Sequence, residues 1–266
     1  MIQQDRFGVY ENLEVGSEKF TMLLVPGGTF MMGSPEDEPG RFVAGVPHNI
    51  KRCDEKQHMV LLTRDFWLAE TACTQGLWHA VMGNNPSRFT GDSNLPVETV
   101  SWNDCNEFMS KLNKIFPIHN FYLPTEAQWE YACRAGTTTP FSFGNNITTD
   151  QVNYDGNYPY NGCKKGLYRA TTVPVKTFVP NRWGFYEMHG NVWQWCHDWY
   201  EKYIDPDKEI ENPKRVLRGG SWYSDAGFCR CATRYLSLYL LNGCDSHIGF
   251  RLSRDCAESD WSNIIF

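Results

Sequence analysis

Cysteine is the residue type with the clearest chemical potential in this chain of 266 residues, which contains ten of them. Two groups come closest to a metal-ligating or catalytic pattern: Cys229 and Cys231, separated by one arginine, and the run Cys196-His197-Asp198. The paired CxxC spacing typical of zinc sites is absent. A chain of this length also lacks the cysteine density of a small disulfide scaffold. We therefore expect most of these thiols to be small buried core side chains.

Other catalytic signatures are missing from the sequence. It has no GxSxG elbow, no phosphate-binding glycine loop and no HExxH helix. The net charge of -6 argues against the dominant basic surface that a nucleic-acid partner needs. The start, residues 1–6, lacks the basic-then-apolar pattern of a signal peptide, and no apolar run is long enough to span a bilayer. We expect a cytoplasmic protein with no membrane partner, unless an export segment lies outside this sequence.

The least regular stretch of the chain is residues 215–254. It begins with an apolar strand, Val216 to Arg218, that runs into Gly219 and Gly220, and it ends with a second strand pattern at 248–252. The run between them fits neither helical nor strand periodicity and is rich in Tyr, Leu, Ser and Asn. Exposed apolar patches usually mark interaction sites, and Tyr with small polar residues is the composition of antibody-like binding surfaces.

Ordinary local signals predict the elements that position this stretch. Residues 22–33 read as a hairpin around a Pro-Gly-Gly turn, and residues 59–62 and 66–69 as two further strands. Three helices follow: 74–82, one capped by Ser101 and ended by Pro117, and one that opens with the capping box Thr125–Gln128. Past Gly136 the pattern becomes loop-rich, without a domain break, which indicates one α+β domain. The second helix should bury one face, formed by Cys105, Phe108, Met109, Leu112 and Phe116.

Several of these segments together resemble the formylglycine-generating enzyme (sulfatase-modifying factor) family. They are VPGGTFMMGS at 25–34, PVETVSWND at 96–104, LPTEAQWEYACRAG at 123–136, NRWGFYEMHGNVWQW at 181–195, RGGSW at 218–222 and IGFR at 248–251. They occur in the family's order. The resemblance implies a C-type-lectin-like fold of the formylglycine-generating type, an α+β, loop-rich single domain over residues 1–266.

The resemblance does not extend to the family's catalytic pair. Oxygen-dependent members use two cysteines just after the Arg-Gly-Gly-Ser motif, and here those places hold Ser224 and Cys229. A hydroxyl replaces neither a thiolate ligand nor a disulfide partner. We therefore expect a protein without catalysis. The alternative is a formylglycine-generating oxidoreductase that acts on a protein cysteine through Cys229.

Calcium is the one cofactor that the resemblance suggests. The family's second calcium loop would use the side chains of Glu187 and Gln194 and the carbonyls of His189 and Val192. Gln194 stands where the family has an acid, and Glu187 restores one negative charge. The competing interpretation is a loop held by its own hydrogen bonds and by Trp193 and Trp195. No other cofactor is expected.

A second resemblance within the same fold concerns residues 216–254. Variable proteins of diversity-generating retroelements end in a hypervariable segment in which mutated AAC codons become NNC, which cannot encode Lys, Glu, Gln, Met or Trp. The resemblance implies a ligand-binding protein with a diversified surface, whose partner is a protein or another macromolecule; a structural subunit is the remaining class. The expected ligand-binding positions, all encodable by NNC, are Tyr223, Ser224, Asp225, Phe228, Thr233, Tyr235, Leu236, Ser237, Leu238, Tyr239, Leu240, Leu241, Asn242, Asp245, Ser246 and His247. We expect these side chains to be solvent-accessible, while Trp222, Cys229 and Phe250 point inward.

Overall fold

The computed structural model describes residues 2–41, 55–200, 214–236, 241–257 and 260. A six-stranded antiparallel sheet runs in the order β1-β2-β3-β6-β12-β7. The late strand β12 lies between β6 and β7, so the last strand of the domain is tied to strands from its first half. The strands are β1 (Ile2–Asp5), β2 (Gly8–Val15), β3 (Glu18–Val25), β6 (Phe66–Ala69), β7 (Phe121–Tyr122) and β12 (Ser253–Asp255).

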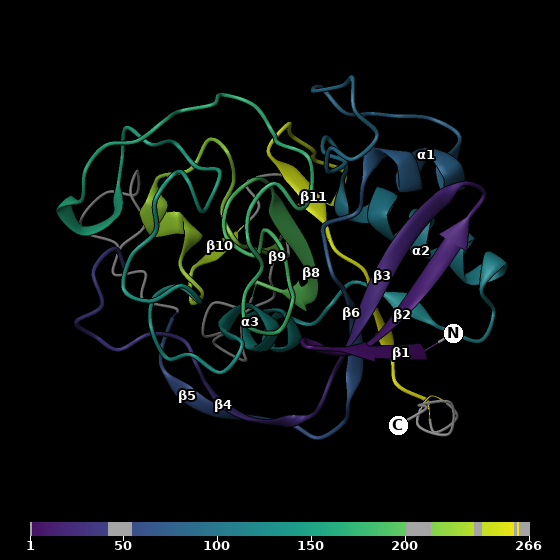
Figure 1. The fold of residues 1–266 in the computed structure, drawn as a ribbon, viewed down its shortest axis with the longest axis horizontal. Helices are drawn as coiled ribbons and strands as arrows, with labels where there is room; N and C mark the ends of the chain where they lie inside the picture. Colours follow the sequence, from purple (N-terminus) through teal and green to yellow (C-terminus); the bar gives the residue numbers. More distant parts are fainter. Residues whose placement is uncertain (1, 42–54, 201–213, 237–240, 258–259, 261–266) are drawn as a thin grey trace, which may run out of the picture.

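A four-stranded sheet carries the stretch that the sequence marks as irregular. Its order is β10-β9-β8-β11, and β11 runs parallel to β8 while the other pairs are antiparallel. A third, two-stranded sheet pairs β4 (Gly28–Met32) with β5 (His58–Leu62). Figure 1 shows the four-stranded sheet in the middle of the molecule, among long loops. Its strands are β8 (Trp193–Trp199), β9 (Arg215–Arg218), β10 (Arg234–Leu236) and β11 (Ile248–Phe250).

The three expected helices are present with the expected caps. α1 (Gln75–Met82) begins after Thr74 and ends at Gly83 in the left-handed conformation. α2 (Trp102–Ile115) has a capping box between Ser101 and Asp104, and α3 (Glu126–Arg134) has one between Thr125 and Gln128. Two short 3-10 turns, η1 (Tyr160–Gly162) and η2 (Ala226–Cys229), interrupt the loops. The α+β fold class is thus confirmed.

The expected hairpin at residues 22–33 is wrong. β3 pairs with β2 and β6, whereas β4 pairs with β5, so the Pro-Gly-Gly turn carries the chain from one sheet to another. Gly27 is needed at this crossing, because a Cβ there would lie 2.7 Å from the carbonyl oxygen of Leu62. Its amide donates to Asp65 Oδ1 at 2.6 Å, which fixes the turn by a residue outside the local pattern. The early strands β1 and β2 were not predicted.

The core joins the helices to both larger sheets. On α2, Cys105, Phe108, Met109 and Leu112 are buried as expected, whereas Phe116 is the C-cap residue and only partly buried. Trp78 stacks on Phe108 with ring centroids 5.4 Å apart, and Phe250 of β11 packs edge-on against both rings. The end of the four-stranded sheet is therefore anchored directly in the helical layer.

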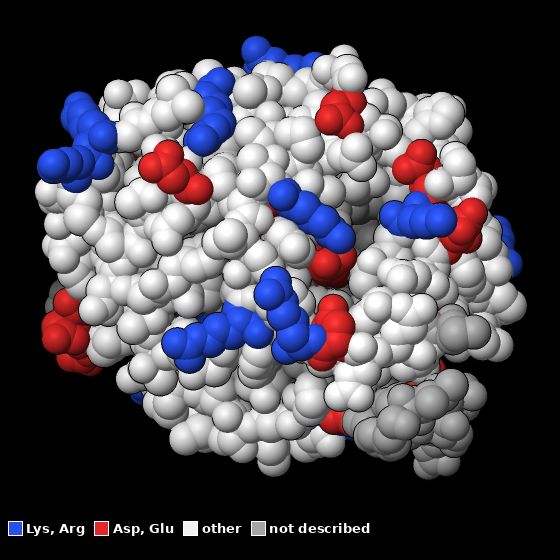
Figure 2. Space-filling view, viewed as in Figure 1, with Lys and Arg blue, Asp and Glu red and all other residues white. Residues whose placement is uncertain are grey.

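On the face shown in Figure 2, acidic and basic side chains are interspersed across a mostly uncharged surface. Within the described ranges, no helix has both the length and the apolar character needed to cross a membrane.

Candidate ligand-binding face

Buried arginines form the frame on which the irregular segment is built. Arg230 donates to Glu38 at 2.6 Å and to Glu55 at 2.8 Å, and Arg218 is paired with Glu130 of α3. Arg251 donates to the carbonyl oxygens of Ala69 at 2.7 Å and of Tyr186 at 2.6 Å. All three guanidinium groups are fully buried, so their hydrogen bonds fix the backbone of the segment against distant parts of the chain.

Directly after β9, the backbone at Gly220 packs closely against Cys229. Gly220 has a φ of 76°, and a Cβ there would lie 2.5 Å from Cys229 Sγ, so only glycine fits. Trp222 is buried next to it: its indole nitrogen donates to the carbonyl of Ser246 at 3.0 Å, and its backbone nitrogen donates to Asn191 at 3.0 Å. Trp222, Cys229 and Phe250 all point inward, as expected.

Outward side chains of the segment gather around two buried tryptophans. Trp193 contacts Tyr235, with ring centroids 5.0 Å apart, and Phe228 at 6.3 Å. Trp222 contacts Tyr223 at 5.4 Å, and Tyr223 lies 6.5 Å from His247. The two groups are joined because the amide of Trp193 donates to the carbonyl of His247. We use the name ligand face for the expected variable positions that are described and not buried; they are Tyr223, Ser224, Asp225, Phe228, Tyr235, Leu241, Asn242, Asp245 and His247.

Exposure differs across the ligand face. Tyr223 is 63% exposed and Asn242 is exposed, while the other members are half-buried. Two of the expected positions must be corrected: Thr233 is only 3% and Ser246 only 8% exposed. Thr233 faces inward because its hydroxyl donates to the carbonyl of Gly227 at 3.1 Å. Ser246 lies under Trp222, whose indole nitrogen donates to the Ser246 carbonyl oxygen. The side chain of Leu236, and Ser237, Leu238, Tyr239 and Leu240, lie outside what the structure describes.

A pocket of about 520 Å³ lies beside the ligand face. One wall is Asp225, Gly227 and Phe228, and the facing wall is the loop Tyr158–Gly162. Tyr158 is exposed and was not expected from the sequence, since it lies far from the irregular segment in the chain. Burial, together with the nearby charge of Asp155, raises the pKa of Asp225.

The positions of the family's catalytic pair, Ser224 and Cys229, lie in this region. Cys229 is fully buried, and burial raises the pKa of its thiol far above the usual value. The hydroxyl of Ser224 accepts a hydrogen bond from the amide of Ser221 at 3.0 Å and is committed to the local turn. A thiol that is both buried and protonated is a poor nucleophile and a poor ligand.

The other cysteine motif is structural as well. Along β8, Cys196 faces the core while His197 points to solvent, so the two cannot act together. Asp198 accepts a hydrogen bond from the amide of Glu126 at 2.7 Å, at the first turn of α3. This carboxylate therefore stabilises the start of a helix.

The expected calcium ligands are arranged for hydrogen bonding. Gln194 Oε1 accepts from the indole of Trp129 at 2.9 Å and from the guanidinium of Arg251 at 3.0 Å. Gln194 Nε2 donates to the carbonyl of Glu187 at 3.1 Å. Calcium takes about six to eight oxygen ligands, and here a cation already occupies the glutamine oxygen. Glu187 is then the one carboxylate left, beside the carbonyls of His189 and Val192. This set of donor atoms does not fit calcium.

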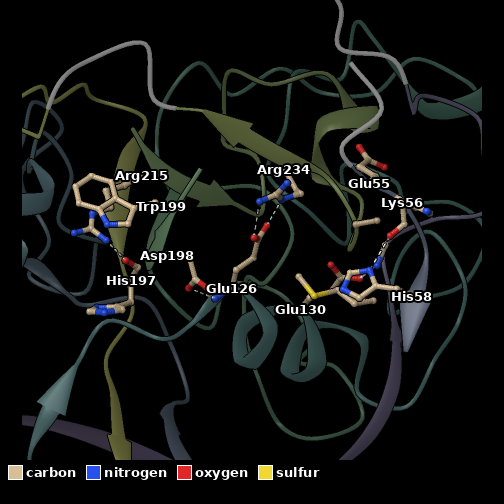
Figure 3. Close-up of a pocket in the computed structure, with 13 residues that line it drawn as sticks. Glu55, Lys56, His58, Glu126, Glu130, His197, Asp198, Trp199, Arg215 and Arg234 are labelled. Carbon is tan, nitrogen blue, oxygen red and sulfur yellow. Dashed lines mark hydrogen bonds and ion pairs between the residues drawn. The ribbon is translucent and has the colours of Figure 1, made fainter. Parts of the chain in front are cut away.

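A second pocket, of about 790 Å³, lies apart from the ligand face (Figure 3). Arg234 points at Glu126 there, with hydrogen bonds of 2.6 and 2.9 Å, and Arg215 stacks on Trp199, 3.3 Å from the ring centroid. Lys56 and His58 form the opposite wall. The arginines that line this pocket are engaged in an ion pair and in ring stacking, so they serve a structural role there.

Comparison with known proteins identifies the family to which this chain belongs. Residues 7–256 match the sulfatase-modifying factor enzyme 1-like domain family, and the chain belongs to that family. The formylglycine-generating enzyme of Streptomyces coelicolor is 32% identical over 221 residues, 74% of this chain and 67% of the enzyme. The mouse formylglycine-generating enzyme is 34% identical over 177 residues, 61% of this chain and 45% of the enzyme. The chain thus matches less than half the length of the mouse enzyme.

A solved structure of similar fold matches nearly the whole chain. Treponema denticola variable protein 1 superposes with a TM-score of 0.73 and 27% identity, over 93% of this chain and 99% of that protein. The expectation of a formylglycine-generating-type fold, shared with a variable protein, is confirmed by these two comparisons together.

Proposed function

We propose that this chain is a non-catalytic ligand-binding protein whose ligand face is diversified by a retroelement. One observation carries the proposal: in the described part of residues 218–251, the arginines that hold the fold together are buried, whereas the expected variable side chains, apart from Thr233 and Ser246, are exposed or half-buried. Arg218, Arg230 and Arg251 bind distant parts of the chain, whereas Tyr223 and Asn242 are exposed. A scaffold tolerates random substitution only where the substituted side chains contribute little to packing.

The chemistry of the ligand face suits a protein or another macromolecule. Tyr223, Phe228 and Tyr235 offer aromatic contact area with few rotatable bonds, and Asp225 offers a polar contact. The frame of buried ion pairs keeps the backbone in place, so little conformational entropy is lost on binding. The match to a variable protein over 93% of the chain supports the same role.

The nucleotide sequence of the gene tests the proposal directly. We expect NNC codons at the exposed and half-buried positions of the ligand face, and a nearby template copy with adenines at the corresponding sites. We also expect a reverse-transcriptase gene in the neighbourhood. Codons ending in other bases at most of these positions, with no template copy, would contradict diversification.

The alternative function rests on the 32–34% identity to formylglycine-generating enzymes. It requires Cys229 to react, although the thiol is buried and Ser224 occupies the partner position. We expect no formylglycine when the protein is incubated with copper, oxygen and a cysteine-containing sulfatase peptide, as read by mass spectrometry. Product formation that Cys229→Ala abolishes and Cys196→Ala preserves would establish the enzyme and refute our proposal.

A further inference from the structure

The pocket beside the ligand face combines a wall of the irregular segment with a loop from an earlier part of the chain. Asp225, Gly227 and Phe228 form the first wall, and residues 158–162 form the facing wall. The volume of about 520 Å³ lies within the range of roughly 300–1,000 Å³ that is typical of ligand sites. Only the first wall contains expected variable positions, so a substitution there changes the pocket while the facing loop stays the same.

Backbone hydrogen bonds hold the two walls together on both sides of Asp225. The amide of Asp155 donates to the carbonyl oxygen of Ser224 at 2.9 Å. The amide of Ala226 donates to the carbonyl oxygen of Tyr158 at 3.1 Å. The pocket is therefore formed before a partner binds, and little conformational entropy is lost when a ligand enters it.

The carboxylate of Asp225 lines this pocket without a partner inside the protein. It is half-buried at the start of η2, where it makes no capping hydrogen bond, and no described residue forms a hydrogen bond or an ion pair with it. Burial, and after it the charge of Asp155, raises the pKa of this carboxyl group, because both disfavour the ionised form. A cation in the pocket favours the ionised form, so charge complementarity selects a positively charged ligand.

Aromatic side chains on both walls add a second preference for the same kind of ligand. Tyr158 is 58% exposed and Phe228 is half-buried, and both line the pocket. A cation is attracted to the face of such rings, and the aliphatic stem of a long basic side chain packs against them.

The arginine beneath the pocket does not repel a second cation. Arg230 donates to the carbonyl oxygens of Gly227 at 3.0 Å and of Gly40 at 2.8 Å, and both glycines line the pocket. Its guanidinium is paired with Glu38 and Glu55, so two carboxylates face one positive charge. This positive charge is therefore already offset within the fold.

We propose that the pocket receives a basic side chain, lysine or arginine, of a protein partner, with its charged group against Asp225 and its stem between Tyr158 and Phe228. The inference rests on the proposed function, because one wall of the pocket belongs to the ligand face, and it names the chemistry of one contact of that face. The net charge of -6 also favours the approach of a basic partner. Since Asp225 and Phe228 are expected variable positions, a chain that differs there should select a different side chain.

Matched peptide pools, incubated with the immobilised full chain, test this contact. Each pool carries random neutral residues around one fixed central residue. That residue is lysine or arginine in two pools and an uncharged analogue, acetyl-lysine or citrulline, in the other two. Mass spectrometry of the bound fraction should show about three- to tenfold more retention of the charged pools, as for a partly exposed charge-assisted contact.

Two matched variants assign the preference to the pocket. Asp225→Asn should remove it without lowering the melting temperature, because the Asp225 carboxylate has no partner in the fold. Asp150→Asn is the control, since Asp150 is exposed and does not line the pocket, and it should keep the preference.

Two outcomes would overturn the basic-side-chain contact. The first is equal retention of charged and uncharged pools by the wild type, or retention of neither, a result that does not depend on any variant. The second is an undiminished preference in Asp225→Asn. Equal retention that Tyr223→Ala lowers would remove the basic contact and leave the ligand-binding function standing. Absence of NNC codons would instead remove diversification and leave the charge preference in place, so the two failures are distinguishable.

Discussion

Glu187 carries a carboxyl group that the fold holds away from water. Burial raises its pKa to about 7, although the amide of Lys176, which donates to Oε2 at 3.1 Å, and the charge of Arg251 oppose the shift. Its other oxygen, Oε1, is buried without a hydrogen-bond partner. The folded state therefore binds the proton more tightly than the unfolded state does.

The tighter proton binding of the folded state makes the free energy of unfolding depend on pH. Because the folded pKa lies above the ordinary value of 4.5, the wild type should lose stability as pH rises from 4.5 to about 7, and little more beyond that. The loss should be at most about 3 kcal/mol, at ~1.4 kcal/mol for each pKa unit. Urea unfolding of wild type and Glu187→Gln at pH 5 and pH 8 measures it, and the variant should lack this part of the loss. An identical pH dependence in both proteins would show that Glu187 is ionised normally.

Arg230 is a residue within the irregular segment 215–254 that we expect not to tolerate substitution. Its buried guanidinium binds Glu38 and Glu55, which lie near the other end of the chain. Arg230→Met leaves two buried carboxylates without their cation and should cost about 3–5 kcal/mol in the free energy of unfolding. Arg182 is exposed, so Arg182→Met is the control and should change stability by less than about 0.5 kcal/mol. Equal, small effects would mean that the ion pairs do not hold the segment.

At the scale of elements, β10 and the turn after β9 place their side chains of the ligand face at different degrees of burial. Tyr235 lies in β10, half-buried and stacked on Trp193, whereas Tyr223 is exposed in the turn. The expectation that the variable side chains are solvent-accessible therefore needs correction at Tyr235 and at Phe228, which both pack against the main hydrophobic cluster.

This difference predicts unequal effects of two matched substitutions. Tyr235→Ala should cost about 1–3 kcal/mol, since it removes a partly buried aromatic contact. Tyr223→Ala should cost less than about 0.5 kcal/mol. Chemical denaturation measures the free energy of unfolding of both variants. A larger loss for Tyr223→Ala than for Tyr235→Ala would contradict our account.

Local signals predicted some elements and not others, for a physical reason. The caps at Ser101 and Thr125 act within four residues, so the sequence shows them directly. Sheet pairing is set by contacts between distant residues. Thus the turn at Gly27 was taken for a hairpin, and the parallel pairing of β11 with β8 could not be foreseen.

At the scale of the whole molecule, one segment is surrounded by anchors from almost every part of the chain. Arg230 reaches the residues before β5, Arg218 reaches α3, and Phe250 reaches α1 and α2. The irregular pattern of residues 215–254 located this segment in the sequence, and the resemblance then suggested its role. The pocket wall at Tyr158 needed the structure, because it depends on which loops meet.

Comparing two libraries of the full chain tests the central claim most directly. One varies Tyr223, Ser224, Asp225, Asn242 and His247 with NNC codons, and the other varies five buried positions, namely Trp222, Cys229, Arg230, Phe250 and Arg251. Protease resistance followed by sequencing measures the folded fraction of each. We predict that most members of the first library resist the protease and most of the second do not, since surface changes cost little and core changes cost several kcal/mol, about 2–5 for large-to-small substitutions. Equal losses in both libraries would show that the ligand face is part of the core and would contradict a diversified binding surface.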